Sequence, residues 1–252
     1  MQTSTRHNLF GAGYLLQALR LIRQQRALWG YVTVPILINL LVGAVLYGSL
    51  FLTGLHAIDL LLPAGALWGV VVGFILRWLL TALLALVVGF LVVRFGVVLG
   101  APWYGRLSEH IEELQSGIAL PDVPFNLVNA LGEVWNALGF ELKKLLLVLP
   151  LSLVLVLINF IPLGGQVIAT AGGFAIGAII SFLDFTDAPF GRRRASFRAR
   201  LGLLWNWKPT SFGFALAALA LSSIPLINLL AIPICVAAGT LMVWDQVERG
   251  EQ

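Results

Sequence analysis

The chain has 252 residues, of which 59% are hydrophobic and 11% are charged, and its mean hydropathy is +0.93. These values lie far outside the range of water-soluble domains and indicate an integral membrane protein. The length leaves room for a single helical membrane domain, residues 1–252, and none for a separate soluble enzyme domain. Cys235 is the single cysteine, which excludes a disulfide within the chain.

The N-terminal stretch predicts an amphipathic helix lying at the membrane surface. Its apolar residues recur close to helical spacing, with polar and basic residues between them; they are Leu9, Phe10, Leu15, Leu16, Leu19 and Ile22. Arg20, Arg23 and Arg26 follow these apolar positions, whereas the basic residues of a signal peptide precede a short apolar core. We therefore expect this helix to remain part of the protein.

Two long apolar stretches predict membrane-spanning helices. Residues 27–53 are long enough to cross a bilayer, and Trp29 and Tyr31 lie near one end as interfacial anchors. Residues 54–65 separate the two stretches. Residues 66–99 form the second stretch, which is longer than a crossing requires, so we expect it to continue through Ala101-Pro102-Trp103 into a polar helix that carries Arg106, Glu109, Glu112 and Glu113.

Two further segments predict helical hairpins that enter the bilayer partway and return. In residues 145–183, two apolar arms flank the turn Ile161-Pro162-Leu163-Gly164-Gly165-Gln166. Each arm would rise only about 24 Å as a helix, less than the roughly 30 Å hydrocarbon core, although two complete spans remain an alternative. The second hairpin has a shorter incoming arm, residues 212–223, which leads into Ile224-Pro225-Leu226-Ile227-Asn228 and a return arm at 229–244.

The polar segments predict surface elements and an orientation. Residues 121–141 have the pattern of an amphipathic surface helix, and residues 187–208 form a basic segment in which Arg192 to Arg194 would attract anionic lipid headgroups. Asp184 and Asp187 are expected to pair with these arginines across a loop.

No Lys or Arg lies between the two long stretches, whereas basic residues flank their other ends, which predicts cytoplasmic termini. Nucleic-acid binding is not expected in so apolar a chain.

The order of short motifs along nearly the whole chain resembles the CysZ-like sulfate transporter family, which shares its membrane domain with etoposide-induced protein. The motifs are Pro35-Ile36-Leu37-Ile38-Asn39, Ala101-Pro102-Trp103 with Gly105, Phe160-Ile161-Pro162 with Gly165-Gln166, Asp187-Ala188-Pro189-Phe190, and Ile224-Pro225-Leu226-Ile227-Asn228-Leu229 with Ile232-Pro233. The resemblance implies an all-α protein of the bacterial inner membrane, with two long transmembrane helices, two partly inserted hairpins and amphipathic surface helices, assembled as a homo-oligomer. It also implies sulfate transport that supplies cysteine biosynthesis.

The chain departs from the family pattern at one position of functional interest. Members of the family carry a pair of arginines just before the first span, which are thought to contact sulfate. Trp29 and Gly30 occupy those positions here. Arg26 lies nearby without aligning with either arginine, and we include it among the candidate substrate contacts.

The turns of the two hairpins are the candidate anion sites. Each return arm begins at its turn, so unpaired backbone N–H groups there would point toward the bilayer interior, as in helix termini that bind anions. The candidate residues are Gly164, Gly165, Gln166 and Asn228. The alternative is that the glycines merely permit the turn while Gln166 and Asn228 cap it.

Arg77 is a further candidate, because an ionisable side chain inside an apolar span often marks a pathway. The alternative is that its side chain snorkels toward a lipid headgroup.

The sequence gives no support for catalysis or a metal site. It contains no His-Glu-x-x-His pair, no Gly-x-Ser-x-Gly elbow and no phosphate-binding Gly-Lys-Ser/Thr loop, and its three histidines lie in separate segments. We therefore expect a transporter of sulfate or a similar small oxyanion that needs no cofactor, and both passive conduction and ion-coupled transport fit. The rival hypothesis is a membrane scaffold that organises lipids or a partner protein.

Overall fold

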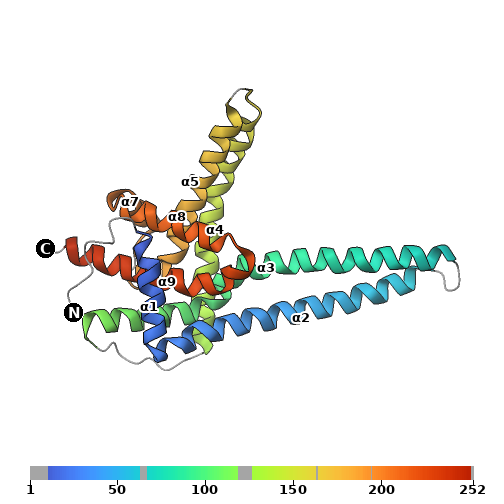
Figure 1. Ribbon diagram of the computed structural model, residues 1–252, viewed down its shortest axis with the longest axis horizontal. Helices are drawn as coiled ribbons and strands as arrows, with labels where there is room; N and C mark the ends of the chain where they lie inside the picture. Colours follow the sequence, from blue (N-terminus) through green and yellow to red (C-terminus); the bar gives the residue numbers. More distant parts are fainter. Residues whose placement is uncertain (1–10, 63–66, 119–126, 163, 194, 251–252) are drawn as a thin grey trace. The chain divides into compact units, whose positions relative to one another are not determined.

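The computed structural model describes residues 11–62, 67–118, 127–162, 164–193 and 195–250, and the regular elements in these ranges are helices (Figure 1). The chain forms two compact units. One comprises Met1–Thr33 and Ala101–Gln252, and the other comprises Val34–Gly100. We call them the helical core unit and the hairpin unit.

The hairpin unit consists of most of α2 (Trp29–Leu61) and the first part of α3 (Leu67–Ser116). Two helices were predicted here, and the continuation of the second through Pro102 is confirmed, because α3 runs unbroken to Ser116. The expectation that residues 54–65 separate the helices was wrong for its first part, since α2 extends to Leu61. After Pro35 the sequence has no further proline until Pro63, so nothing forces an earlier end.

Small residues bring α2 and α3 together inside the hairpin unit. A Cβ atom on Gly54 would lie 2.7 Å from Leu80, and one on Gly96 would lie 3.0 Å from Nδ2 of Asn39. Glycines at such contacts let two membrane helices approach closely. Large apolar side chains cover the remaining surface, and Leu52 and Leu86 are exposed by 68% and 73%. An apolar surface of this kind suits contact with lipid tails.

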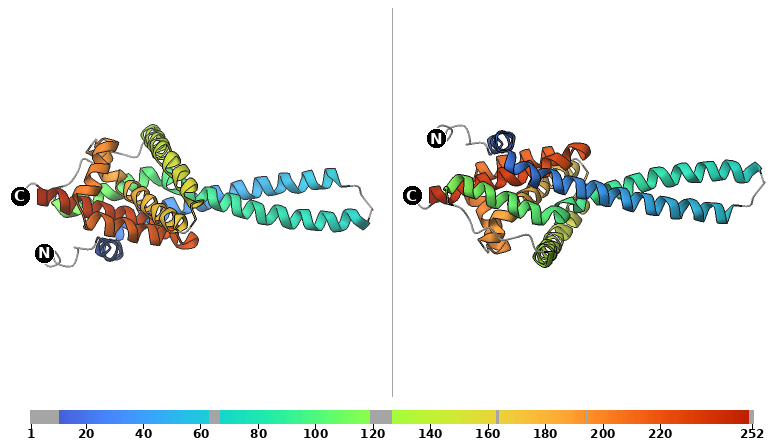
Figure 2. Two further views of the ribbon diagram at one scale, coloured as in Figure 1. Left: turned by 90° about the horizontal axis from the view of Figure 1, so that it is seen from above. Right: turned by 90° about the horizontal axis from the view of Figure 1, so that it is seen from below.

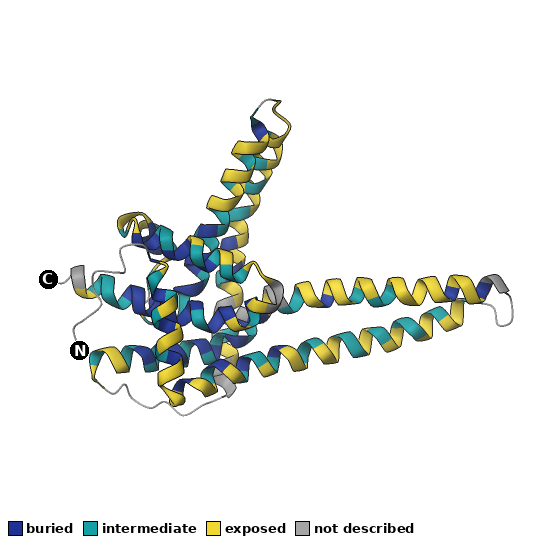
Figure 3. Cartoon of the chain, viewed as in Figure 1, coloured by how far each residue is buried: buried dark blue, intermediate teal, exposed yellow. Residues whose placement is uncertain are grey.

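The helical core unit is built around α9 (Pro225–Gly250), which packs against α1 (Gly13–Gln24), α5 (Gly165–Phe185), α6 (Asp187–Arg192) and α8 (Thr210–Ser222). Short elements η2 (Arg26–Leu28) and α7 (Phe197–Asn206) complete it, together with α4 (Leu127–Asn159) and the end of α3. Buried residues concentrate along α8, α9 and the base of α5 (Figure 3). Two further views show α1 end-on, beside α8 and α9 (Figure 2).

The predicted N-terminal helix is present, and one of its faces packs against protein. Tyr14, Ala18 and Ile22 are buried in α1, whereas Leu16 and Leu19 are exposed by 61% and 40%. Leu9 and Phe10 lie outside the described residues. Helix α1 packs against α8 and α9, whereas Leu16 and Leu19, two of the residues predicted to lie at the membrane surface, stay exposed.

The first predicted hairpin corresponds to α4 and α5. The expected surface helix at 121–141 and the incoming arm form one continuous helix, α4, so their separation was wrong; residues 121–126 lie outside the described residues. Lys144, which lies between the two predicted segments, is only 5% exposed and does not interrupt the helix. The second predicted hairpin corresponds to α8 and α9. The bounds of α8 are close to the predicted 212–223, whereas α9 extends several residues beyond the predicted 229–244 at each end.

Four described helices are long and apolar enough to cross a membrane. They are Arg26–Leu61, Gly69–Val92, Gly165–Phe185 and Ile227–Glu248. The last of these is largely buried inside the helical core unit, whereas few residues of the first two are buried. The all-helical membrane architecture is therefore confirmed at this level.

Candidate functional site

The turn between α4 and α5 places the two candidate glycines in different environments. The N–H groups of Ile161 and Gly165 donate to the carbonyls of Ile158 and Ile161 over 2.9 and 3.2 Å, which closes the turn. Gly165 is buried, and a Cβ atom there would lie 2.1 Å from the Ile158 carbonyl oxygen. Gly164 has no atom within 4 Å of an added Cβ, and the side chain of Gln166 is exposed. Gly165 is thus required by packing, while its neighbours face outward.

The turn between α8 and α9 holds the remaining predicted turn residue. The backbone N–H of Asn228 donates to the Ile224 carbonyl over 2.7 Å, and its side chain is only 5% exposed. Ser223 closes the preceding helix through its N–H and hydroxyl, which donate to Leu219 over 2.9 and 2.6 Å. Both turns belong to the helical core unit, yet they lie well apart within it (Figure 1). One chain does not bring the two predicted anion sites together.

The two candidate arginines are also separate from these turns. Arg26 lies in η2 with its side chain exposed. Arg77 lies in the hairpin unit, where its Nη2 atom is 2.6 Å from Oδ1 of Asp59. About half of each side chain is exposed. The Arg77 charge is therefore balanced by a carboxylate.

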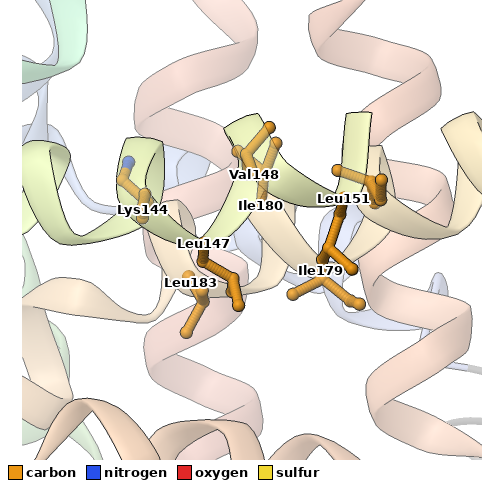
Figure 4. A pocket seen from close by; sticks show the side chains of 8 residues that line it. Lys144, Leu147, Val148, Leu151, Ile179, Ile180 and Leu183 are labelled. Carbon is orange, nitrogen blue, oxygen red and sulfur yellow. The ribbon is translucent and has the colours of Figure 1, made fainter. Parts of the chain in front are cut away.

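The structure reveals buried ion pairs that the sequence analysis missed. Lys144 of α4 lies between the carboxylates of Glu141, one helical turn earlier, and Asp184 of α5. It caps a narrow crevice whose other lining residues are apolar side chains of α4 and α5, Leu147, Val148 and Leu151 facing Ile179, Ile180 and Leu183 (Figure 4). Glu141 and Lys144 have the i, i+3 spacing of a helical ion pair, which was the available signal.

Lys144 lies outside the four apolar spans, and its ammonium is strongly held. Burial by itself lowers its pKa, but the nearby carboxylates of Asp184 and Glu141 outweigh this effect, so the pKa of Lys144 is raised. The side chain is consequently charged throughout the physiological pH range. A buried cation held by carboxylates from two helices fastens α4 to α5.

A second ion pair joins α6 to α7. The Arg200 guanidinium contacts the Asp187 carboxylate and lies over the Phe140 ring, 4.6 Å from its centroid. The predicted pairing of Asp184 and Asp187 with Arg192 and Arg193 was wrong, because these aspartates pair with Lys144 and Arg200 instead; Arg194 lies outside the described residues. Sequence proximity favoured a local pairing, but the packing of α4 and α7 supplies other cations.

Arg192 and Arg193 share Glu112, which comes from the polar end of α3. Arg192 Nη2 lies 3.1 Å from Glu112 Oε2, and Arg193 Nη1 lies 2.7 Å from Glu112 Oε1. Arg192 also donates to the Ser108 hydroxyl over 2.7 Å, and the Thr240 hydroxyl of α9 lies 2.8 Å from that of Ser108. We call Ser108, Glu112, Arg192, Arg193 and Thr240 the Glu112 cluster.

The described residues hold no group of three or more His, Cys, Asp or Glu side chains arranged for a metal ion. Among the histidines, His110 lies 3.7 Å from Glu113 and packs its ring against Tyr31 with centroids 5.1 Å apart. The chemistry that these arrangements offer is the binding of anions by backbone N–H groups and guanidinium ions.

Comparison with known proteins agrees with the predicted resemblance. The model of the family described as sulfate transporter CysZ/etoposide-induced protein 2.4 matches residues 14–233. Sulfate transporter CysZ of Pseudomonas aeruginosa is 31% identical over 245 residues, which cover 97% of each chain. The proteins of the same name from Pseudomonas syringae pv. tomato and Salmonella typhimurium are 31% and 26% identical, and the matches cover 96% and 86% of this chain and 94% and 88% of theirs. The chain therefore belongs to the CysZ/etoposide-induced protein 2.4 family.

Proposed function

We propose that this protein carries sulfate, or a closely similar small oxyanion, across the bacterial inner membrane and thereby supplies cysteine biosynthesis. The observation that carries the proposal is the match with proteins named sulfate transporter CysZ over 97% of the chain. The extended apolar helices agree with a membrane location. No cofactor and no enzymatic step is part of the proposal.

The architecture that we propose is a single membrane domain with cytoplasmic termini. Helices α2 and α3 cross the bilayer, while the α4–α5 and α8–α9 hairpins enter it partway. Support for partial insertion of the α8–α9 hairpin comes from α8, whose 13 residues rise only about 20 Å, too little for a crossing. The α8–α9 pair must then begin and end on the same side. Helix α5 is long enough to cross, so two complete spans remain the alternative for the α4–α5 hairpin.

The anion path in this proposal passes the turns of the two hairpins. The N–H groups of Gly165 and Asn228 are bonded within their turns, so the neighbouring N–H groups at the starts of α5 and α9 would bind the anion, without a charged side chain. Gly164 and Gln166 are open to a ligand, Gly165 shapes the turn, and Asn228 lies at the start of α9. Because the two turns lie apart in one chain, we propose that a homo-oligomer combines turns from neighbouring copies. Arg26 and Arg77 are proposed as secondary contacts that draw anions toward the path.

The test is the uptake of radiolabelled sulfate into proteoliposomes. Gly165 is a poor probe because any side chain there meets the Ile158 carbonyl, so loss of uptake would not distinguish a binding defect from a misformed turn. Gly164→Leu and Gln166→Ala place the change on the open side of the turn instead. Gly173→Leu is the matched control, since Gly173 is an exposed glycine in the middle of α5 with no atom within 4 Å of an added Cβ.

We expect selenate to suppress uptake, chloride to leave it unchanged, and Gly164→Leu to lower it while Gly173→Leu does not. Equal uptake by both glycine variants would contradict the anion site at the turn. No uptake above empty liposomes by folded, inserted protein would contradict sulfate transport itself and would favour the membrane scaffold.

A further inference from the structure

The Glu112 cluster has the composition of an oxyanion site that already holds a carboxylate. Two guanidinium groups contact the two oxygens of one carboxylate, at 3.1 Å from Arg192 and 2.7 Å from Arg193. Arginine is the residue best suited to bind carboxylates, phosphates and related oxyanions through paired N–H donors. The Glu112 side chain is 12% exposed, so its carboxylate is held largely away from water.

The charge balance of this cluster differs from that of the other described ion pairs. Lys144 faces two carboxylates, those of Glu141 and Asp184, and Arg200 and Arg77 each face one, from Asp187 and Asp59. In the Glu112 cluster two cations share one carboxylate. A dianion in the position of that carboxylate would balance both arginines.

The cluster also has more donors than a carboxylate uses. The Arg192 Nε atom is buried, and no described group accepts its hydrogen. The hydroxyls of Ser108 and Thr240 are fully buried and already paired, since Ser108 accepts from Arg192 and Thr240 lies 2.9 Å from the Val236 carbonyl oxygen. A carboxylate offers two oxygens, whereas a tetrahedral oxyanion offers four, one of which could accept from the Arg192 Nε–H.

Access to the cluster is open on the arginine side. The side chains of Arg192 and Arg193 are 25% and 31% exposed, whereas Ser108 and Thr240 lie at the closed end with no exposed surface. A ligand can therefore approach across the guanidinium groups, and the Glu112 side chain, at 12% exposure, can leave by the same opening.

We infer that the Glu112 cluster is a second anion site, for a doubly charged tetrahedral oxyanion, and that the Glu112 carboxylate occupies it until the anion displaces it. The inference deepens the proposed function and rests on it for the choice of sulfate as ligand. An internal competitor weakens the apparent affinity, because the site is open in only a fraction of the molecules. Weak binding of this kind suits transport, since a permeating ion must also leave its site.

The experiment measures equilibrium binding of radiolabelled sulfate to the purified full chain in detergent. Glu112→Gln keeps the size of the side chain but removes the competing charge, and we expect sulfate to bind roughly tenfold more tightly. Glu109→Gln is the matched control, because it removes the same charge three residues earlier on α3 and should leave the affinity as in the wild type. Adding Arg193→Gln to Glu112→Gln should abolish the gain.

Thermal unfolding provides a second readout on the same proteins. Sulfate should raise the unfolding midpoint of the Glu112→Gln protein more than that of the wild type. If Glu112→Gln does not yield folded protein, Glu112→Asp replaces it; this variant keeps the charge but shortens the reach to the arginines, and it should show a smaller gain in affinity.

Sulfate affinity that is the same in the wild type, Glu112→Gln and Glu109→Gln would overturn the inference, even if uptake into proteoliposomes establishes transport. An equal gain in both glutamine variants would also overturn it, because the effect would then be one of overall charge. Conversely, the tenfold gain in affinity would support an oxyanion site even if the wild type shows no sulfate uptake. That combination would contradict the proposed transport and leave the oxyanion site standing.

Discussion

The Tyr14 hydroxyl donates a hydrogen bond of 2.9 Å to Oδ2 of Asp245, which fastens α1 to the C-terminal part of α9. The two residues are 231 positions apart in the sequence. Tyr14 is completely buried, so its ring contributes to the same contact as its hydroxyl. The N-terminal helix is thus part of the helical core unit and does more than rest on a lipid surface.

Tyr14→Phe should lower the free energy of unfolding by roughly 1 to 2 kcal/mol, because it removes a hydrogen bond to a carboxylate and keeps the ring. The midpoint of thermal unfolding in detergent measures the effect. Tyr47→Phe is the control, because Tyr47 stacks on Phe51 in the hairpin unit through its ring, with centroids 5.7 Å apart. Equal midpoints for the two variants would show that the Tyr14 hydrogen bond contributes nothing measurable.

Lys144→Met should destabilise the protein by about 3 to 5 kcal/mol, because it leaves the Glu141 and Asp184 carboxylates buried beside one another without their cation. Lys143→Met, one residue earlier, changes an exposed side chain and should alter stability by no more than about 0.5 kcal/mol. Denaturation midpoints of the two variants in the same detergent give the comparison. A loss of similar size in both would argue against a special role for the buried ammonium.

The Lys144 contribution should also have a defined dependence on pH. Because the pKa of Lys144 is raised above its ordinary value of 10.5, the stabilisation is fully present below that value and is lost as the pH rises through the folded-state pKa. The difference in stability between the wild type and Lys144→Met should therefore stay constant from about pH 7 to pH 9. A difference that shrinks within this interval would mean that the ammonium is deprotonating.

The variants Arg77→Gln and Asp59→Asn test whether the Arg77 charge attracts the anion or serves only to pair with Asp59. If Arg77 draws anions inward, Asp59→Asn should raise sulfate uptake, since it uncovers the positive charge, and Arg77→Gln should lower it. Uptake unchanged in both variants would leave the pair a structural contact.

The helices were predictable where the sequence carries its own signal. Long apolar runs and the Ile-Pro-Leu turns predicted α2, α3 and both hairpins, because length and hydropathy are local properties. The wrong expectations concerned neighbours in space. The continuity of α4 and the partners of Asp184 and Asp187 depend on which helix packs alongside, and no local pattern contains that information.

At the candidate site, too, the sequence identified individual residues but not their partners in space. Sequence reasoning left two roles open for Gly165, an anion contact or a residue that permits the turn, and the Ile158 carbonyl, which lies where a Cβ atom would be, favours the second. Arg77 was selected as an ionisable residue in a span, and its Asp59 partner became evident only from the folded hairpin unit. The Glu112 cluster was not predicted, because its members come from α3, α6 and α9.

By itself, the sequence determined that this is an all-helical membrane protein, where its long apolar helices lie along the chain, and to which family it belongs. Composition and motif order suffice for this, because a bilayer imposes apolar segments of nearly fixed length on any chain. The tertiary structure alone decided which charges are paired and which glycine lies against a carbonyl. These features depend on distances of a few ångströms between helices that are far apart in the sequence, and only the packed chain sets those distances.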